Sequence, residues 1–336
     1  MVRPGASGMN RHGFLLVGVA LSAVLLAWTL HGLHLEEWTR ALSGLKIPWL
    51  LIGALFYFVA VILRTWRWGI LLHSLQSTGF RDRFIALTIG YMGNNLYPAR
   101  AGELLRAYVL QRRCGIRVST ALGTIVVERV LDGLMVVFLA LVALLFFPLP
   151  ASLRSAVMAG GVVFGGALLM LLGMARNAAK LHDLLERISR HRLGLRMERA
   201  MAFLSRFLDG LTVLQRPAHA LAVGGLTALI WLAEAGTYSL VMQAFPFRAS
   251  FFSLLVMTAT VNLATALPSA PGYVGTFEAP GIVVLRAFGI PAGAAFAYTL
   301  FLHLVLWLPI TLLGLFLFLR EGLRGMEKPA DVSTSS

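Results

Sequence analysis

Long apolar stretches dominate the chain, and polar residues gather between them. Six stretches are long enough to cross the roughly 30 Å hydrocarbon core of a bilayer as helices. They run over Phe14 to Leu33, Ile47 to Leu63, Ala121 to Phe147, Val157 to Met174, Leu221 to Phe245 and Ala292 to Leu319. The pattern therefore predicts an all-α polytopic membrane protein with about six full spans.

Two further apolar regions, Phe84 to Leu110 and Phe251 to Phe288, are each broken near the middle. Pro98 interrupts the first region, and Pro271 with Gly272 interrupts the second. We interpret both regions as re-entrant helical hairpins, which enter the bilayer and leave it on the side they entered. Broken helices at bilayer depth are typical of binding sites in transporters.

These segments predict one integral membrane domain over residues 1–336. Its expected parts are a first span (13–33), a first repeat half (47–147), a further span (151–176), a cytoplasmic amphipathic segment (177–216), a second repeat half (220–319) and a cytoplasmic tail (320–336). Each half consists of a span, a broken hairpin and a span, with the two hairpins opening to opposite sides. This order predicts an inverted repeat.

Basic residues are distributed unevenly between the two sides of this topology. Most of the 29 lysine and arginine residues fall on the side of the N-terminus. The opposite side holds Arg40, Lys46, Arg154, Arg248 and Arg286. The positive-inside rule then places both termini in the cytoplasm, and we expect a multi-pass protein of the bacterial inner membrane. The formal net charge of +14 reflects this topology, so we expect no nucleic-acid partner.

Composition supports the membrane interpretation. Hydrophobic residues make up 58% of the chain and charged residues 13%, about half the charged share of a soluble domain. The single cysteine, Cys114, excludes a disulfide framework. We find no motif for a metal, a cofactor or a catalytic nucleophile, and we expect a protein that is not an enzyme.

Five of the 15 acidic residues fall at membrane depth: Glu103, Glu128, Asp132, Glu234 and Glu278. Each needs a basic partner, a water-filled cavity or a proton, because an unpaired carboxylate is costly in hydrocarbon. In the third span, Arg129 reaches Asp132 at i+3, whereas Glu128 and Asp132 share a face at i+4. This motif is either an internal ion pair that locks helices or a site with one carboxylate left over.

Charged residues also follow the break in the first hairpin. Arg100, Glu103 and Arg106 recur every three residues and would form one stripe on a helix that begins near Pro98. Two guanidinium groups beside a helix N-terminus favour a phosphate. The alternative is a kinked helix whose arginines extend to the interface.

The second hairpin differs, because its deep charge, Glu278, is acidic. Glu278 and Glu234 can carry a proton, bind a cationic head group or remain neutral against a neighbouring helix. His303, in the last predicted span, is a candidate for the same proton path. Arg64 and Arg67 stand among aromatic residues at the end of the second span, which is typical of an anchor at the cytoplasmic boundary.

Three ordered motifs carry a family resemblance: Asn95…Pro98-x-Arg100-x-Gly102-Glu103-x-x-Arg106, Glu128-Arg129-x-x-Asp132 and Pro268…Pro271-Gly272-x-x-Gly275-x-x-Glu278. Together they resemble the flippase-like family named for the transmembrane region of lysylphosphatidylglycerol synthase. The resemblance implies a lipid-translocating membrane domain. Because the sequence ends soon after its last predicted span, we do not expect the aminoacyl-transferase activity of the bifunctional synthases.

The leading hypothesis is a translocase for a lipid with an anionic or lipid-linked head group. The predicted substrate-binding residues are Asn95, Arg100, Glu103, Arg106, Glu128, Arg129, Asp132, Glu234, Asn262, Gly272 and Glu278. The expected partner is a membrane lipid, namely a phospholipid, a polyprenyl-linked lipid or a hopanoid; a second copy of the chain or lipid-synthesis enzymes are further options. Alternatives are a membrane-embedded transferase with Glu103 or Glu278 as base, and a scaffold subunit of a lipid-synthesis complex.

Overall fold

The computed structural model describes residues 35–73, 75–97, 100–146, 151–189, 195–211, 217–266 and 269–326, together with positions 20, 24 and 25. Within these residues the regular secondary structure is helical, with no β-strand. The predicted first span at 13–33 lies almost wholly outside the described residues, and so do Pro98, Pro268 and the tail after residue 326. The all-α prediction is confirmed.

Twelve α-helices and one short 3-10 helix make up the described part of the chain. They are α2 (Leu35–Leu42), α3 (Ile47–His73), α4 (Phe80–Leu96), α5 (Gly102–Cys114), α6 (Val118–Phe146), α7 (Ala151–Arg176), α8 (Ala178–Ser189), α9 (Leu195–Asp209), α10 (Pro217–Met242), α11 (Phe251–Ala264), η2 (Pro271–Tyr273), α12 (Glu278–Ala287) and α13 (Ala292–Met326). Helices α3, α7, α10 and α13 contain segments long and apolar enough to cross a membrane. The protein is therefore a polytopic helical membrane protein.

Helix α3 is longer than the apolar pattern predicts. The predicted span ends at Leu63, whereas the helix continues through Arg64 and Arg67 to His73. Both arginines are buried. Because their charges are compensated by neighbouring helices, as described below, these arginines are not exposed in the way that an interfacial anchor requires.

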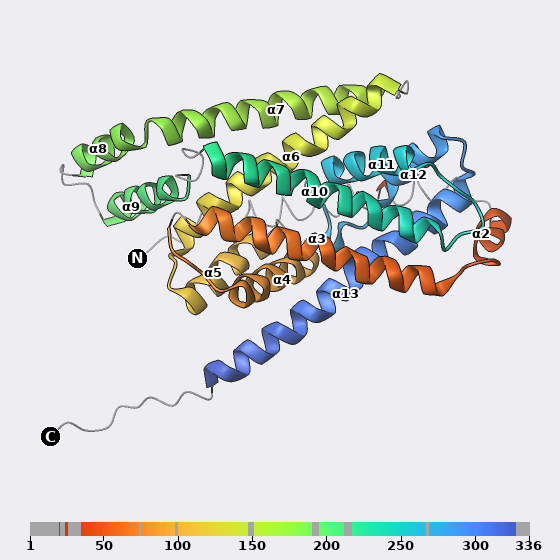
Figure 1. The fold of residues 1–336 in the computed structure, drawn as a ribbon, viewed down its shortest axis with the longest axis horizontal. Helices are drawn as coiled ribbons and strands as arrows, with labels where there is room; N and C mark the ends of the chain where they lie inside the picture. Colours follow the sequence, from red (N-terminus) through yellow and green to blue (C-terminus); the bar gives the residue numbers. More distant parts are fainter. Residues whose placement is uncertain are drawn as a thin grey trace, which may run out of the picture.

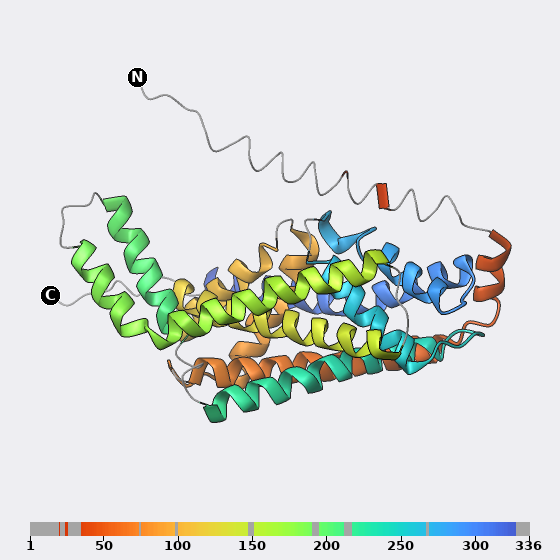
Figure 2. The ribbon, with the colours of Figure 1, turned by 90° about the horizontal axis from the view of Figure 1, so that it is seen from above.

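Helices α3 and α10 lie side by side along much of their length (Figures 1 and 2). Glycine makes this close approach possible. A Cβ atom on Gly53 of α3 would lie 2.7 Å from Cγ2 of Val241, and one on Gly236 of α10 would lie 2.9 Å from the ring of Phe56. Small residues at such contacts let helix backbones approach inside a membrane, where packing rather than the hydrophobic effect holds helices together.

Two pairs of short helices form hairpins in opposite halves of the molecule. The α4–α5 hairpin lies in the left half of Figure 1, and the α11–α12 hairpin lies in the right half. In the first hairpin, a Cβ atom on Gly102 would overlap the carbonyl oxygen of Gly90 and the backbone nitrogen of Asn94. The two helices therefore meet backbone to backbone, as an interruption by glycine allows.

The broken ends of both hairpins meet near the middle of the molecule. The Arg100 guanidinium, just before α5, donates to the carbonyl oxygen of Thr265, just after α11, at 3.0 Å. Asn95, near the end of α4, donates to the hydroxyl of Thr311 in α13 at 2.7 Å. The interruptions predicted from proline and glycine thus come together in space.

Contacts at the two ends of the molecule join segments that are distant in sequence. At one end, Arg113 of α5 pairs with Asp82 of α4 at 2.6 Å and with Glu321 of α13 at 2.5 Å. Helices α8 and α9 lie toward this end, and α2 lies at the opposite end (Figure 1). There the Glu37 carboxylate accepts a hydrogen bond from the Gly293 amide at 2.9 Å, at the start of α13.

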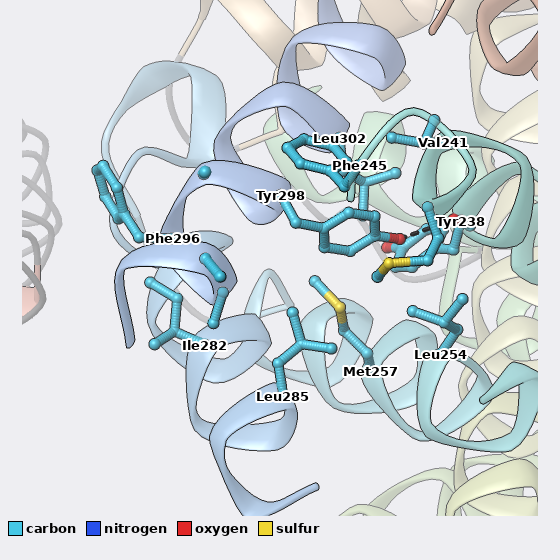
Figure 3. Packing of buried hydrophobic residues seen from close by; sticks show 14 of the residues in the cluster. Tyr238, Val241, Phe245, Leu254, Met257, Ile282, Leu285, Phe296, Tyr298 and Leu302 are labelled. Carbon is cyan, nitrogen blue, oxygen red and sulfur yellow. Dashed lines mark hydrogen bonds between the residues drawn. The ribbon is translucent and has the colours of Figure 1, made fainter. Parts of the chain in front are cut away.

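A large apolar core surrounds the second hairpin. Side chains of α10, α11, α12 and α13 interdigitate there, and Figure 3 shows Met257 and Leu285 facing the ring of Tyr298. The Tyr298 hydroxyl donates to the carbonyl oxygen of Tyr238 at 2.8 Å. This packing holds the second hairpin in place beside the central polar residues.

Candidate functional site

A network of buried charges joins α3 to α6 and α10. Arg64 lies 2.5 Å from the Glu234 carboxylate of α10. Arg67, one turn further along α3, donates to both carboxylate oxygens of Asp132, at 2.5 and 3.0 Å. It also donates to the Thr227 hydroxyl at 2.9 Å. A two-pronged contact of this kind suits the planar guanidinium group.

Glu128 extends the network from α6 to α5. Its carboxylate lies 2.7 Å from Arg106 and 3.5 Å from Arg67. The Arg106 guanidinium stacks on the Trp68 ring, 3.6 Å from its centroid. Trp68 in turn donates to the Thr124 hydroxyl of α6 at 3.1 Å. Arg106 is therefore fixed between a carboxylate and an aromatic face.

The remaining members connect the network to the centre of the molecule. Arg129 lies 3.1 Å from Asp132, the predicted i+3 pair, and 3.8 Å from Glu103. Trp231 of α10 also donates to Asp132, at 3.2 Å. The network thus contains four guanidinium groups and four carboxylates, so its formal charges balance.

Arg100 stands apart from this balance. No carboxylate among the described residues lies within ion-pair distance of it, and its polar contact is the Thr265 carbonyl. Its backbone has a φ of 53°, an uncommon value for a residue with a side chain. Because α5 begins at Gly102, Arg100 lies before the helix and not on one stripe with Glu103 and Arg106. The prediction that Arg100 shares one helical stripe with Glu103 and Arg106 is therefore wrong.

Glu278 has a partner on the last helix. Its carboxylate lies 2.5 Å from Nδ1 of His303 and accepts a hydrogen bond from the Gly275 amide at 2.6 Å. The His303 ring stacks on Phe277, with the ring centroids 4.4 Å apart. The carboxylate that is isolated in the sequence is thus held from two sides.

The three predicted neutral residues occupy different surroundings. Asn262 donates to the Thr258 carbonyl of its own helix at 2.8 Å. Gly272 adopts a φ of 75° in η2, which the absence of a side chain permits. Asn95 belongs to the contact between α4 and α13 described above.

A central cavity of about 160 Å³ lies where the two hairpins meet. Most of its polar lining residues come from the candidate set or its partners. They include Arg64, Asn95, Arg100, Arg129, Asp132, Glu234, Asn262, Thr265, Tyr273, His303 and Trp307. Arg106 and Glu128 support this wall from behind and do not line the cavity. The chemistry available here is anion binding by Arg100 beside a neutral, preformed polar wall.

Sequence reasoning missed the role of Arg64 and Arg67. Their position at the end of an apolar run indicated an interfacial anchor, but they are only 6% and 0% exposed and are paired with acidic residues. The anchor interpretation holds at most for Trp66, which is exposed. Their spacing of three residues on one apolar helix was the available signal, since it places both arginines on one face.

The fold and the site define a class: a polytopic helical membrane protein with two broken hairpins around a buried polar cavity. The chain belongs to the family described as the lysylphosphatidylglycerol synthase TM region, whose model matches residues 15–314. The resemblance seen in the motifs is thereby confirmed.

Curated relatives support the same assignment. A UPF0104 membrane protein of Methanothermobacter thermautotrophicus is 27% identical over 88% of this chain and 90% of its own length. A UPF0104 membrane protein of Methanocaldococcus jannaschii is 23% identical over 67% of this chain and 92% of its own length. The glycosyltransferase AglD of Haloferax volcanii is 27% identical over 88% of this chain, but the match covers 53% of AglD. No solved structure matches the chain.

Proposed function

We propose that this protein is a lipid translocase, which moves a lipid with an anionic head group from one leaflet of a cell membrane to the other. The observation that carries the proposal is Arg100, which lines a central cavity of a membrane protein and has no carboxylate partner among the described residues. A cation at this depth needs compensation, and a phosphate group supplies it. A guanidinium group has five N–H donors, and the Thr265 carbonyl accepts from only one of its nitrogens.

The arrangement of the hairpins supports an alternating-access scheme within this proposal. The α4–α5 hairpin opens toward one end of the molecule and the α11–α12 hairpin toward the other, with their broken ends in contact. We interpret them as re-entrant elements of an inverted repeat, with both termini in the cytoplasm. In such transporters the two halves move against each other around a central site.

Arg100 links the two hairpins in this scheme. A head group that binds the remaining guanidinium donors and draws the side chain away from Thr265 of the other hairpin would loosen the contact between the halves. The charge-balanced network behind the cavity has a different role. Arg67 and Arg106 each form an ion pair with a carboxylate of α6, so they hold α3, α5 and α6 together while Arg100 binds the head group.

The test is head-group translocation in proteoliposomes, measured as the loss of fluorescence when dithionite reaches labelled phosphatidylglycerol. Arg100→Ala should slow translocation by about 10- to 100-fold, the worth of one charge-assisted interaction. Arg112→Ala is the matched control, since Arg112 lies in the same hairpin, is exposed and forms no ion pair among the described residues. Equal rates for wild type and Arg100→Ala above the protein-free background would disprove the proposal.

A membrane-embedded transferase is the second candidate, and the relative named glycosyltransferase AglD favours it. The matched part is about half of AglD, so the named activity can belong to the other half. Mass spectrometry of lipids after incubation with the purified protein separates the two candidates. A transferase leaves a covalently changed lipid, whereas a translocase leaves every lipid mass unchanged.

A further inference from the structure

An apolar groove of about 390 Å³ lies on the side of the molecule, against the central cavity. Its walls come from the end of α4, from the η2 segment and Val274, from Glu278 at the start of α12 and from the first half of α13. Leu96, Val274 and Leu304 line it and are 40–46% exposed. In a membrane protein, such an apolar and open surface faces lipid tails.

The groove and the central cavity share three lining residues, Asn95, His303 and Trp307. The two spaces therefore meet at one place, which we call the neck. At the neck the Trp307 indole Nε1 is buried and has no hydrogen-bond acceptor among the described residues. A Cβ atom on Gly272 would lie 3.4 Å from this nitrogen, so the glycine packs directly beside the indole. A buried donor without an acceptor costs free energy unless a ligand supplies one.

The order of cavity, neck and groove matches the order of chemical groups in a membrane lipid. Among the described residues, the cavity offers the Arg100 guanidinium without a carboxylate partner, the neck offers the Trp307 N–H without an acceptor, and the groove offers hydrocarbon contacts. A lipid has an anionic head, a linkage with phosphate or ester oxygens, and an apolar tail in the same order. A water-soluble anion in the cavity would leave the apolar groove empty.

We propose that the groove binds one hydrocarbon tail of the lipid whose head group enters the cavity, and that Trp307 donates a hydrogen bond to the oxygen atoms of its linkage. This inference rests on the proposed function and adds a substrate class. The substrate is a lipid whose tail lies in the groove while its head group lies in the central cavity. The groove walls would then select lipids by the shape of the hydrocarbon tail.

The position of the groove also selects a leaflet. It runs along α13 from Trp307 to Phe296, which packs on Trp38 of α2 with ring centroids 5.3 Å apart. The tail therefore lies in the leaflet at the α2 end of the molecule. With both termini in the cytoplasm, this is the outer leaflet, so the described conformation is the one that accepts or releases lipid there.

The first test is photo-crosslinking with phosphatidylglycerol that carries a diazirine in one acyl chain. Peptide mapping should concentrate the label on the groove, at the η2 segment and at Leu300 and Leu304. Bulk lipid contact would instead label Leu312 and Phe316 equally, since these residues are also exposed on α13. An equal distribution would overturn the proposal.

The second test fills the groove. Leu304→Trp should lower crosslinking and translocation of phosphatidylglycerol by at least about tenfold, the effect of about 1.4 kcal/mol. Leu308→Trp is the matched control, because Leu308 lies one turn further on α13, is similarly exposed and does not line the groove. Trp307→Phe keeps the ring but removes the donor, and should lower crosslinking about 5- to 10-fold.

The outcomes separate this inference from the translocase proposal. One outcome is that Leu304→Trp and Leu308→Trp translocate lipid at the same rate while Arg100→Ala does not translocate it. The proposal that the groove binds a lipid tail is then wrong, and the translocase proposal is retained. The opposite outcome is that the label maps to the groove but the wild-type protein translocates no lipid. The proposal of a tail-binding groove is then retained, and the translocase proposal is wrong.

Discussion

At the scale of single residues, charge compensation decides which side chains hold the fold and which remain available. Arg64 and Glu234 form a close pair 2.5 Å apart, and both side chains are less than 10% exposed. Removing one partner of a buried pair leaves the other charge uncompensated. Substitutions in this pair therefore measure how much of the free energy of unfolding depends on pairing each buried charge.

Arg64→Met should lower the free energy of unfolding by about 3–5 kcal/mol, because Glu234 then stays buried without its cation. The double variant Arg64→Met/Glu234→Leu should recover most of this loss, since two apolar groups need no compensation. Thermal unfolding in detergent micelles measures both effects. A double variant less stable than Arg64→Met would contradict the compensation argument.

Local pairs at this scale were predictable, but distant ones were not. The contact between Arg129 and Asp132 follows from helical spacing and is confirmed at 3.1 Å. Arg64 and Glu234 are 170 residues apart, and the spacing of residues within one segment contains no information on such a contact. For the same reason, the histidine beside Glu278 was a candidate for a proton path but not an identified partner. Whether the predicted set binds substrate stays a prediction.

At the scale of elements, backbone contact between the two helices of a hairpin replaces side-chain packing. Gly102 begins α5 directly against Gly90 and Asn94 of α4. A methyl group at this point has no space, and the two nearest atoms it would meet belong to the backbone, which cannot rotate away. The hairpin therefore depends on glycine at this contact.

Gly102→Ala should destabilise the protein by about 1–3 kcal/mol, because the hairpin must open to admit the methyl group. Gly165→Ala in α7 is the matched control, since a Cβ atom there meets no heavy atom within 4 Å. It should leave stability unchanged or raise it by up to about 1 kcal/mol, because alanine is the better helix former. Equal melting temperatures for the two variants would show that the hairpin tolerates opening.

Most helices could be predicted from apolar periodicity, and their ends could not. Proline and glycine identified both broken regions correctly, because these residues cannot continue a helix without cost. The start of α5 at Gly102 depends on contact with α4, which propensity does not describe, and this shift removed Arg100 from the predicted stripe. The extension of α3 past Leu63 has the same origin, since tertiary pairing compensates Arg64 and Arg67.

At the scale of the whole molecule, the two ends differ in charge. Arg113 pairs with Asp82 of α4 and Glu321 of α13 at the end toward which α8 and α9 lie, and these two helices carry further arginines, including Arg187 and Arg206. Burial of Arg64, Arg67 and Arg106 removes them from the count of interfacial charge. The remaining basic residues still favour this end as the cytoplasmic side.

The single cysteine tests this orientation. Cys114 ends α5 at the basic end and is partly buried. A membrane-impermeant maleimide should label it in inside-out vesicles and not in intact cells. Burial raises the pKa of the Cys114 thiol, so labelling should be slow at neutral pH and should increase about tenfold per pH unit until the thiol ionises.

A second cysteine position provides the control. In a Cys114→Ser background, Arg286→Cys places an exposed thiol at the end of α12, in the opposite half of the molecule. It should show the reverse accessibility, with labelling in intact cells. Labelling of Cys114 in intact cells would reverse the proposed orientation.

The pairing of Arg64 with Glu234 also has a consequence for synthesis in the cell. The helix that carries Arg64 is made well before α10, which supplies both the carboxylate and the Trp231 ring that lies under the guanidinium. Until α10 is inserted, the nascent first half holds a buried cation without its partner, a state that membranes tolerate poorly. The two halves therefore mature together, and a chain interrupted before α10 exposes the charge that cellular quality control can recognise.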